Sequence, residues 1–193
     1  MILPIVAYGD PVLKKEAEEI DADYPGLKEL ITNMFETMEA ASGVGLAAPQ
    51  VGLGIRLFVV DTTAFVDEDE DDEEMRELIG FRRVFINPII LEEEGEKWNF
   101  NEGCLSIPGI REDVARKPKI TIEYYDENFE LKEEVYEGLR ARVIQHEYDH
   151  VDGILFTDRL NPLRKQFLKK KLDNIAKGWV EVDYKMKFPK ARR

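Results

Sequence analysis

The segment that decides the fold is Gly138-Leu139-Arg140-Ala141-Arg142-Val143-Ile144-Gln145-His146-Glu147-Tyr148-Asp149-His150-Val151. Leu139 and Val143 recur at the spacing of one helical turn, and Gly153 follows where such a helix would end. His146 and His150 are also four residues apart, so a helix places both imidazoles on the face of Leu139 and Val143. This face is therefore predicted to point into the interior of the protein.

Helical patterns also occur on either side of this segment. Apolar residues recur at helical spacing over 25–41, and Asp10-Pro11 is typical of the start of a short helical turn. Asn161 followed by Pro162 is a favourable N-cap and first position for a last helix that ends near residue 177. We therefore expect helices both before and after the histidine-bearing one.

Extended segments cluster in the middle of the chain. Runs rich in apolar and β-branched residues predict strands at 55–61, 81–91, 98–101, 119–125 and 131–136. The turn over 126–128 joins the last two strands as a hairpin, and Pro88 indicates either an edge strand or a bend. Because the strands do not alternate with helices, we expect an α+β fold. Its mostly antiparallel strands would pack around the central helix, with a further helix at the C-terminal end.

The composition is typical of one globular domain. The chain has 193 residues, of which 44% are hydrophobic and 35% charged, and its formal net charge is −13. This charge disfavours a stable complex with nucleic acid or an anionic membrane. Cys104 is the only cysteine, which excludes an intrachain disulfide. The sequence shows neither a signal-peptide pattern nor an apolar run of about 18 residues, so we expect a cytoplasmic protein without a membrane span.

Charge is distributed unevenly along the chain. Eight consecutive acidic residues occupy 67–74, whereas 164–193 hold eleven lysines and arginines against three acidic residues, a net of +8. A block of like charges repels itself, so a solvated loop is favoured over partner or cation binding for the acidic run. The basic end is also expected to be a solvated surface, with contact to RNA phosphates as the alternative. We expect one domain over 1–177, with an acidic insertion loop over 62–80, followed by a basic extension over 178–193.

The residues His146-Glu147-Tyr148-Asp149-His150 form an H-E-x-x-H sequence. Two imidazoles one turn apart can bind the same metal ion, which would make this a metal-binding helix. Glu147 follows the first histidine, where it can reach a metal-bound water without being a ligand, as a general base does. The alternative is a pair of core histidines hydrogen-bonded to carboxylates. The metal is favoured because the chain has no other histidine.

A third metal ligand has to come from another segment, because a catalytic tetrahedral site takes three protein ligands and keeps one position open. Downstream, no context distinguishes Asp152 or Asp158. Upstream, Cys104 lies in Glu102-Gly103-Cys104-Leu105-Ser106. A lone cysteine is usually a small buried hydrophobe, but beside two histidines its thiolate becomes the better candidate. The segment 43–50, Gly-Val-Gly-Leu-Ala-Ala-Pro-Gln, allows a close backbone approach, yet by itself it favours a helix end followed by a turn.

Together, the three segments resemble the peptide deformylase family. The family's signatures G-x-G-L-A-A-x-Q, E-G-C-L-S and H-E-x-D-H are matched in that order at 43–50, 102–106 and 146–150. The resemblance runs from the N-terminus to about residue 177 and favours the bacterial form with a helical C-terminus. It implies a metal-dependent hydrolase that removes the N-formyl group from formylmethionine on nascent peptides and releases formate.

The resemblance also implies roles for individual residues. Glu147 would act as general base and acid, while Gln50 and the backbone N–H of Leu105 would stabilise the oxyanion. Gly45 would pair with the substrate backbone. The ligands of one divalent metal ion would be Cys104, His146 and His150. The family is associated with Fe²⁺, and Zn²⁺, Ni²⁺ or Co²⁺ can occupy such a site.

Residues that flank the motifs are candidates for substrate contacts. Apolar residues could form a slot for methionine, with plain core packing as the equal alternative. Arg142 could line the entrance, Asp149 could orient a ligand or cap a polar contact, and Glu102 could pair with Arg111 or Arg116. The candidate substrate-binding residues beside Gly45 are Val44, Phe100, Leu139, Val143 and Arg111. A transient contact of the basic C-terminus with the ribosome is a weaker hypothesis, prompted by its charge and the origin of the substrate.

Two other functions are weighed against this one. A peptidase with the H-E-x-x-H sequence would cut internal peptide bonds, but no downstream ligand is evident and Cys104 lies in its own motif. A metal-holding binding protein would need neither Glu147 nor Gln50, and the chain contains both.

Overall fold

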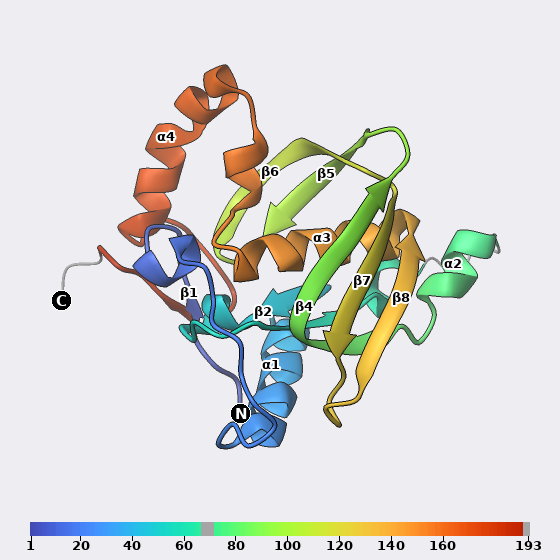
Figure 1. Cartoon of the computed structure of the whole chain (residues 1–193). Helices are drawn as coiled ribbons and strands as arrows, with labels where there is room; N and C mark the ends of the chain where they lie inside the picture. The colour runs from blue at the N-terminus through green and yellow to red at the C-terminus, as the bar shows by residue number, and fades with distance from the viewer. Residues whose placement is uncertain (67–71, 191–193) are drawn as a thin grey trace.

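The computed structural model describes residues 1–66 and 72–190. Its main sheet is antiparallel, in the order β2-β3-β4-β7-β8 (Figure 1). These strands are β2 (Gly45–Ala47), β3 (Leu57–Asp61), β4 (Arg82–Glu94), β7 (Lys119–Tyr125) and β8 (Leu131–Glu137). A separate antiparallel hairpin consists of β5 (Trp98–Cys104) and β6 (Ile107–Arg116). The helix α3 (Gly138–Val151) packs on β2, β3 and β8 and faces the hairpin on its other side. The expected α+β fold around a central helix is confirmed.

The helix α3 spans the residues that its pattern predicts. It follows β8 directly, because Gly138 takes a φ of 60° that turns the chain from strand into helix. At its other end, Gly153 takes a φ of 73° and donates its N–H to the carbonyl of His150. Most of α3 is buried, including both histidines. Packing around most of the helix therefore fixes the positions of its side chains, including both histidines.

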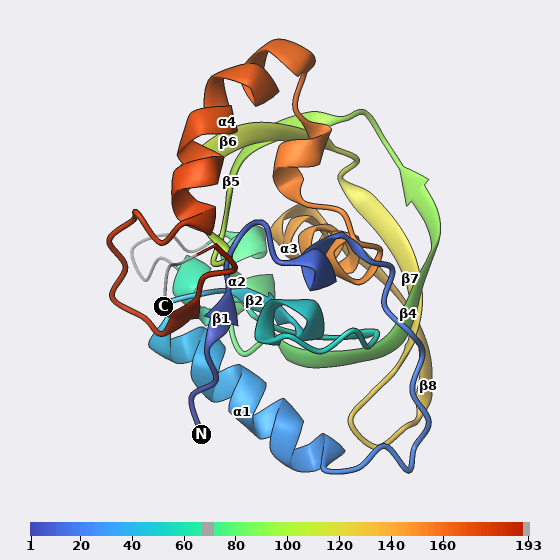
Figure 2. The ribbon, with the colours of Figure 1, turned by 90° about the vertical axis from the view of Figure 1, so that its left-hand side faces the viewer.

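At β3 the main sheet is covered on both faces, as the alternation along this strand shows. Phe58 and Val60 pack in the core cluster that contains Val143 and Ile144 of α3. Leu57 and Val59 point to the opposite face. They pack in a second cluster with the buried side of the helix α1 (Leu27–Ala40). Figure 2 shows α1 and α3 on opposite sides of β2.

The helix predicted over 25–41 is confirmed as α1, but a glycine does not take the left-handed position at its end. The left-handed residue after α1 is Ser42, with a φ of 54°, and Gly43 donates its N–H to the carbonyl of Met38. The expected turn over Gly43 and Gly45 is wrong, because Gly45–Ala47 form strand β2. A 3₁₀-helical turn, η2 (Ala48–Val51), follows.

The insertion over 62–80 is not simply a loop. Thr63–Phe65 form a 3₁₀ turn, η3, and Glu73–Leu78 form the helix α2. The carboxylate of Asp72 caps α2 by accepting from the N–H of Met75 at 2.9 Å, and acidic residues favour the first turn of a helix. The rest of the acidic run, 67–71, lies outside the described residues. The expected loop is therefore wrong for 73–78, whereas residues 72–74 of the acidic run are exposed to solvent as expected.

Pro88 marks both of the features that were considered for it. It lies in β4 just past Ile86, the last residue of β4 that pairs with β3, so from there on β4 pairs with β7 alone among the described strands. Pro88 also falls where the register with β7 shifts between Ile86 and Ile89, next to Asn87 at a φ of 49°. Both the edge and the bend are therefore present. Strand β6, over 107–116, was not predicted at all.

The C-terminal part returns to the body of the protein. A short turn, η4 (Phe156–Arg159), leads to the helix α4 (Pro162–Ala176), which confirms the expected last helix with Asn161 as its N-cap. The chain then continues as an extended segment to β9 (Met186–Lys187), which pairs in parallel with β1 (Ile5–Val6). The predicted turn after Asp10 is present as η1 (Pro11–Lys14). No described helix is both long and apolar enough to cross a membrane.

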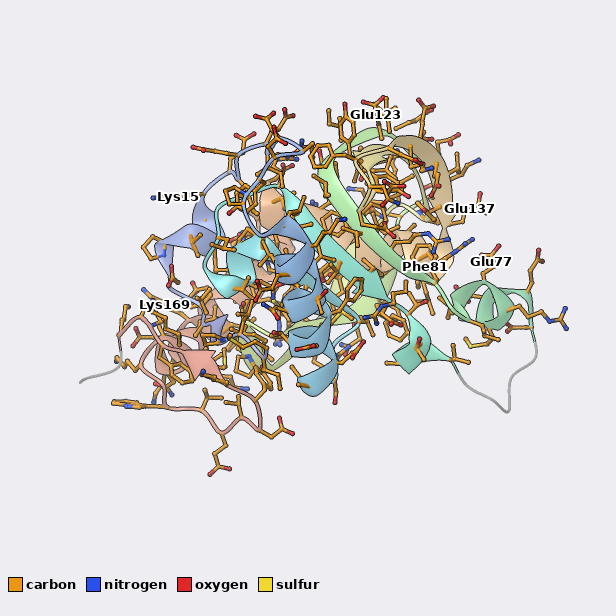
Figure 3. The ribbon with its side chains drawn as sticks, turned by 90° about the horizontal axis from the view of Figure 1, so that it is seen from below. Lys15, Glu77, Phe81, Glu123, Glu137 and Lys169 are labelled. Carbon is orange, nitrogen blue, oxygen red and sulfur yellow. The ribbon has the colours of Figure 1, made fainter. Side chains whose placement is uncertain are left out.

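Charges are separated over the surface. Figure 3 shows Lys15 and Lys169 at one side of the molecule and Glu77, Glu123 and Glu137 at the other.

Candidate active site

The three sequence motifs meet at one place. Cys104 ends β5, and His146 and His150 lie one turn apart on α3. One potential ligand atom from each of these residues lies within 4.8 Å of the others, and the Cys104 Sγ is 3.4 Å from the His150 Nε2. Both histidines are buried and the cysteine is half-buried. A thiolate and two imidazoles at these distances form a donor set suited to one transition-metal ion.

The carboxylate of Glu102 orients His146. Its Oε1 lies 2.8 Å from the His146 Nδ1, which leaves the other ring nitrogen to serve as a ligand. Burial disfavours the charge on Glu102, but hydrogen bonds from Arg116 and His146 outweigh it and hold the pKa of Glu102 well below its usual range. Glu102 is therefore ionised at neutral pH and fixes the ring of His146.

Two buried arginines neutralise this carboxylate. Arg116 donates to both oxygens of Glu102, at 2.7 and 2.9 Å, and Arg142 donates to the Oε2 at 2.8 Å. Arg142 was expected at the entrance of the pocket but is only 2% exposed. Of the two partners considered for Glu102, Arg116 is the correct one. Arg111 instead donates to the side chain and carbonyl of Asn101.

Asp149 does not contact either histidine in the way that we expected of a ligand-orienting group. Its carboxylate accepts hydrogen bonds from Arg116 at 2.8 Å and from Arg159 at 2.6 Å. Arg116 therefore bridges Asp149 and Glu102. These buried ion pairs connect the C-terminal half of α3 to β5 and β6, and so fix the relative positions of the elements that carry Cys104, His146 and His150.

The residues at the cluster fit a divalent metal ion. Burial holds the pKa of His150 well below its usual range, so this imidazole is neutral, as a metal ligand must be. The Glu147 Oε2 is buried and has no hydrogen-bond partner among the described residues. Such an atom is expected beside the position of a metal-bound water.

Glu147 lies beside the cluster but in a different environment from Glu102. Burial raises the pKa of Glu147 to about 7. Its carboxylate packs against Gly45 of β2, and a Cβ at that position would lie only 2.7 Å from the Glu147 Cδ. Only glycine leaves room for the carboxylate there. A carboxyl group with a pKa near neutrality can both accept and return a proton.

Gln50 is buried and points its amide towards the cluster. Its Oε1 accepts from the N–H of Ala47 at 2.9 Å, which fixes the orientation of the side chain. Its Nε2 then lies 3.4 Å from the Cys104 Sγ and 3.3 Å from the Ser106 Oγ. Leu105 follows Cys104, and its carbonyl accepts from the hydroxyl of Tyr184 at 2.7 Å. One hydrogen-bond donor, the Gln50 amide, thus lies next to the sulfur of the candidate ligand Cys104.

A cavity of about 640 Å³ opens onto these residues. The side chains that we predicted for substrate contact line it, with one exception. Leu139 is not among the lining residues. Those that do line it are Val44, Gly45, Phe100, Arg111 and Val143.

Two parts of the wall were missed. Phe65, from the insertion, lines the cavity and makes an edge-to-face contact with Phe100, with ring centroids 6.4 Å apart. Residues 181–184 line it from the C-terminal extension. A signal for the second part exists in the sequence: Val180, Val182 and the apolar residues after them alternate with charged ones, which is typical of a strand.

Comparisons with known proteins identify the family. The sequence model of the family described as polypeptide deformylase matches residues 2–166. A peptide deformylase of Christiangramia forsetii is 63% identical over 100% of this chain and 99% of that protein. The structure of peptide deformylase from Thermus thermophilus is 44% identical, with a TM-score of 0.77 over 91% of this chain and 98% of the other. One from Legionella pneumophila is 38% identical, also with a TM-score of 0.77, and covers 90% and 95%. The chain therefore belongs to the peptide deformylase family, metal-dependent hydrolases that remove the N-formyl group from nascent peptides.

Proposed function

We propose that this chain hydrolyses the formyl group of N-terminal formylmethionine by general acid–base catalysis at a metal centre. One observation carries the proposal. Glu147, buried and with one oxygen unpartnered, lies in the same cavity as the Cys104 and His146 of the ligand cluster. Binding a metal would not require this carboxylate, whereas activating a water for attack on an amide does.

The metal would be held by Cys104, His146 and His150. When bound, a divalent ion supplies Lewis acidity for the attack of water on the formyl carbon. We propose Fe²⁺ as the native ion, since a thiolate with two imidazoles suits it, and the same donors accept Zn²⁺, Ni²⁺ or Co²⁺.

The side chains around the cluster would move the protons and stabilise the charge. Glu147 takes a proton from the attacking water and returns it to the amine as the C–N bond of the formamide breaks. The products are formate and a peptide with a free amino terminus. The negative charge that develops on the formyl oxygen is met by the Gln50 amide and the backbone N–H of Leu105, as in other oxyanion holes.

The substrate would bind along the edge of the main sheet. The strand order begins with β2, so its outer side is free to pair with an extended peptide, with Gly45 contacting the substrate backbone. Val44, Phe100 and Val143 would surround the methionine side chain. Leu139 was a further candidate but lies outside the cavity wall, and Arg111 would contact polar parts of the peptide.

The catalytic domain would comprise residues 1–177, with the insertion at 62–80 and the basic extension at 178–193. Lysines of α4, such as Lys165, Lys169 and Lys170, are exposed. They would support a transient contact with the ribosome, where formylated peptides emerge, and the proposed enzyme would act in the cytoplasm.

Two measurements test this proposal. Protein purified without air is assayed for release of formate from a formyl-Met peptide, with an unformylated peptide as the control for internal cleavage. We expect formate and no internal cleavage; metal-loaded protein that releases no formate would refute the function. In parallel, Cys104→Ala is analysed for metal. It should lose the ion, and an unchanged stoichiometry would refute the ligand set.

A further inference from the structure

The C-terminal extension returns to the cavity instead of leaving the body of the protein. After α4, the N–H of Trp179 donates to the carbonyl of Asn174 at 2.9 Å. Farther along, the carbonyls of Lys185 and Lys187 accept from the N–H groups of Ile5 and Ala7, both at 2.9 Å. Figure 2 shows this segment running alongside β1. The extension is thus attached at both ends, and the residues between these ends have a defined position.

Side chains of the extension alternate between the interior and the solvent. Val180 and Phe188 pack on the core cluster beneath α4, and Tyr184 packs on the cluster beneath α1. The Tyr184 hydroxyl also donates to the carbonyl of Leu105, next to the metal-ligating cysteine. Glu181 and Asp183 are exposed. The inward residues therefore fix the outward ones at a set place beside Leu105.

Glu181 and Asp183 line the same cavity as the catalytic residues. Neither carboxylate forms an ion pair within residues 1–66 and 72–190. At the inner end of this cavity lies the unpartnered, buried Glu147 Oε2, which marks it as a site for a ligand. Residues 181–184 lie beyond 2–166, the range that the family model matches.

We propose that residues 181–184 are a specificity-determining wall of the substrate cleft. The carboxylates of Glu181 and Asp183 would favour formyl peptides that carry lysine or arginine in the two residues after methionine. This inference rests on the proposed function. With the formyl group at the cluster, an extended peptide advances about 3.3 Å per residue, so the next two residues pass the exposed part of the wall.

Of the other charges at the cavity, Glu102 and Arg142 are buried and neutralise each other. The guanidinium of Arg111 is bonded to Asn101, which carries no charge, so Arg111 remains a cation that opposes part of this preference. An exposed pair of opposite charges changes an equilibrium by a factor of about 1.4 to 5. Because each of the two carboxylates both attracts lysine and repels glutamate, removing both is expected to lower the ratio of kcat/KM between the two kinds of peptide at least about fourfold.

The test compares three amidated peptides: formyl-Met-Lys-Lys, formyl-Met-Ser-Ser and formyl-Met-Glu-Glu. The wild type is compared with Glu181→Gln/Asp183→Asn at low salt, and thermal melting verifies that the variant is folded. The control is Glu96→Gln/Glu127→Gln, which changes the net charge equally at exposed residues that do not line the cavity. Single variants then assign the share of each carboxylate.

The measured quantity is the ratio of kcat/KM for the lysine peptide to that for the glutamate peptide. We expect the wild type and the control to share a high ratio, which falls at least about fourfold in the double variant and in about 1 M salt. A double variant that keeps the wild-type ratio would overturn the inference. If the wild type released no formate even from the serine peptide, the proposed function itself would fail, so the two failures are distinguishable.

Discussion

Replacing Glu102 by glutamine tests the buried charge network behind the metal-ligand cluster. The substitution keeps the size of the side chain, so it creates no cavity, but it removes the charge and turns one acceptor oxygen into a donor. That donor then faces guanidinium N–H groups. Arg142 loses its only described carboxylate partner, while Arg116 keeps Asp149 at 2.8 Å.

The expected cost follows from the burial of these groups. Glu102 is 4% exposed, and Arg116 and Arg142 are 4% and 2% exposed. Removing one partner of such a buried pair costs about 3–5 kcal/mol, because the other charge stays in a low-dielectric surrounding. Since Asp149 still neutralises Arg116, we expect a loss of about 3 kcal/mol in the free energy of unfolding. Glu102 also orients His146, so metal affinity should fall about 10- to 100-fold.

Urea unfolding of metal-stripped protein measures the first effect, because bound metal would add its own stabilisation. Competition with a chelator measures the second. The matched control is Glu112→Gln, whose partner Arg164 is 48% exposed, and there the loss should stay below about 1 kcal/mol. If Glu102→Gln lost no more stability than this control, the buried network would not support the fold as argued.

Three further perturbations follow from other parts of the structure. Gly45→Ala places a Cβ against the Glu147 carboxylate and should slow formate release about 10²-fold with full metal content; an unchanged rate would contradict the packing. Burial opposes the charge on Asp61, but hydrogen bonds from Thr63 and the ion pair with Arg82 outweigh it and lower the pKa of Asp61. This stabilisation is present above the unfolded pKa of about 3.8 and is lost as pH falls through the folded pKa. Urea midpoints of wild type and Asp61→Asn should therefore differ at pH 7 and converge in acid, and a constant difference would refute this. Phe85 is fully buried and its ring is stacked on that of Phe58, with centroids 4.7 Å apart. Phe85→Ala leaves a cavity there and should lower the free energy of unfolding by about 3–5 kcal/mol, whereas a loss below about 1 kcal/mol would contradict tight packing.

The central helix and its histidines were predictable because the information is local. Four-residue spacing sets one face of a helix, and the same stripe that places Val143 in the core places His146 and His150 beside it. Cys104 is 46 residues away from His150 in sequence, so no local pattern places it there. Its assignment depended on the small number of possible ligands and on the resemblance of three motifs.

The missed elements carry weaker local signals. Strand β6 holds Gly109 and several charged residues, and its buried positions do not alternate regularly, because it pairs only with β5. Strand β2 is short and glycine-containing, so its sequence favours a turn until β3 pairs with it. The pairing of Glu102 with Arg116 and Arg142 depends on three elements distant in sequence, which only the tertiary fold brings together.

The extension shows how charge can hide a strand pattern. Its lysines suggested a solvated basic tail, although apolar residues alternate with charged ones from Val180 to Phe188. Half of these side chains pack on the core, and the other half are exposed. For this segment, the alternation of apolar and charged residues predicts the structure better than the net charge does. One face of an extended segment is enough to bury every second side chain, whatever charges the other face carries.

Glu147→Gln tests whether Glu147 is the general base of the proposed reaction. Glutamine keeps the shape of the side chain and leaves Cys104, His146 and His150 in place, but it cannot take a proton from water. Metal content and formate release from a formyl-Met peptide are measured on the same anaerobic sample. If Glu147 is the general base, Glu147→Gln binds one metal ion per chain and releases formate at least about 10²-fold more slowly than the wild type. A variant that binds the metal and hydrolyses the peptide at the wild-type rate would contradict it.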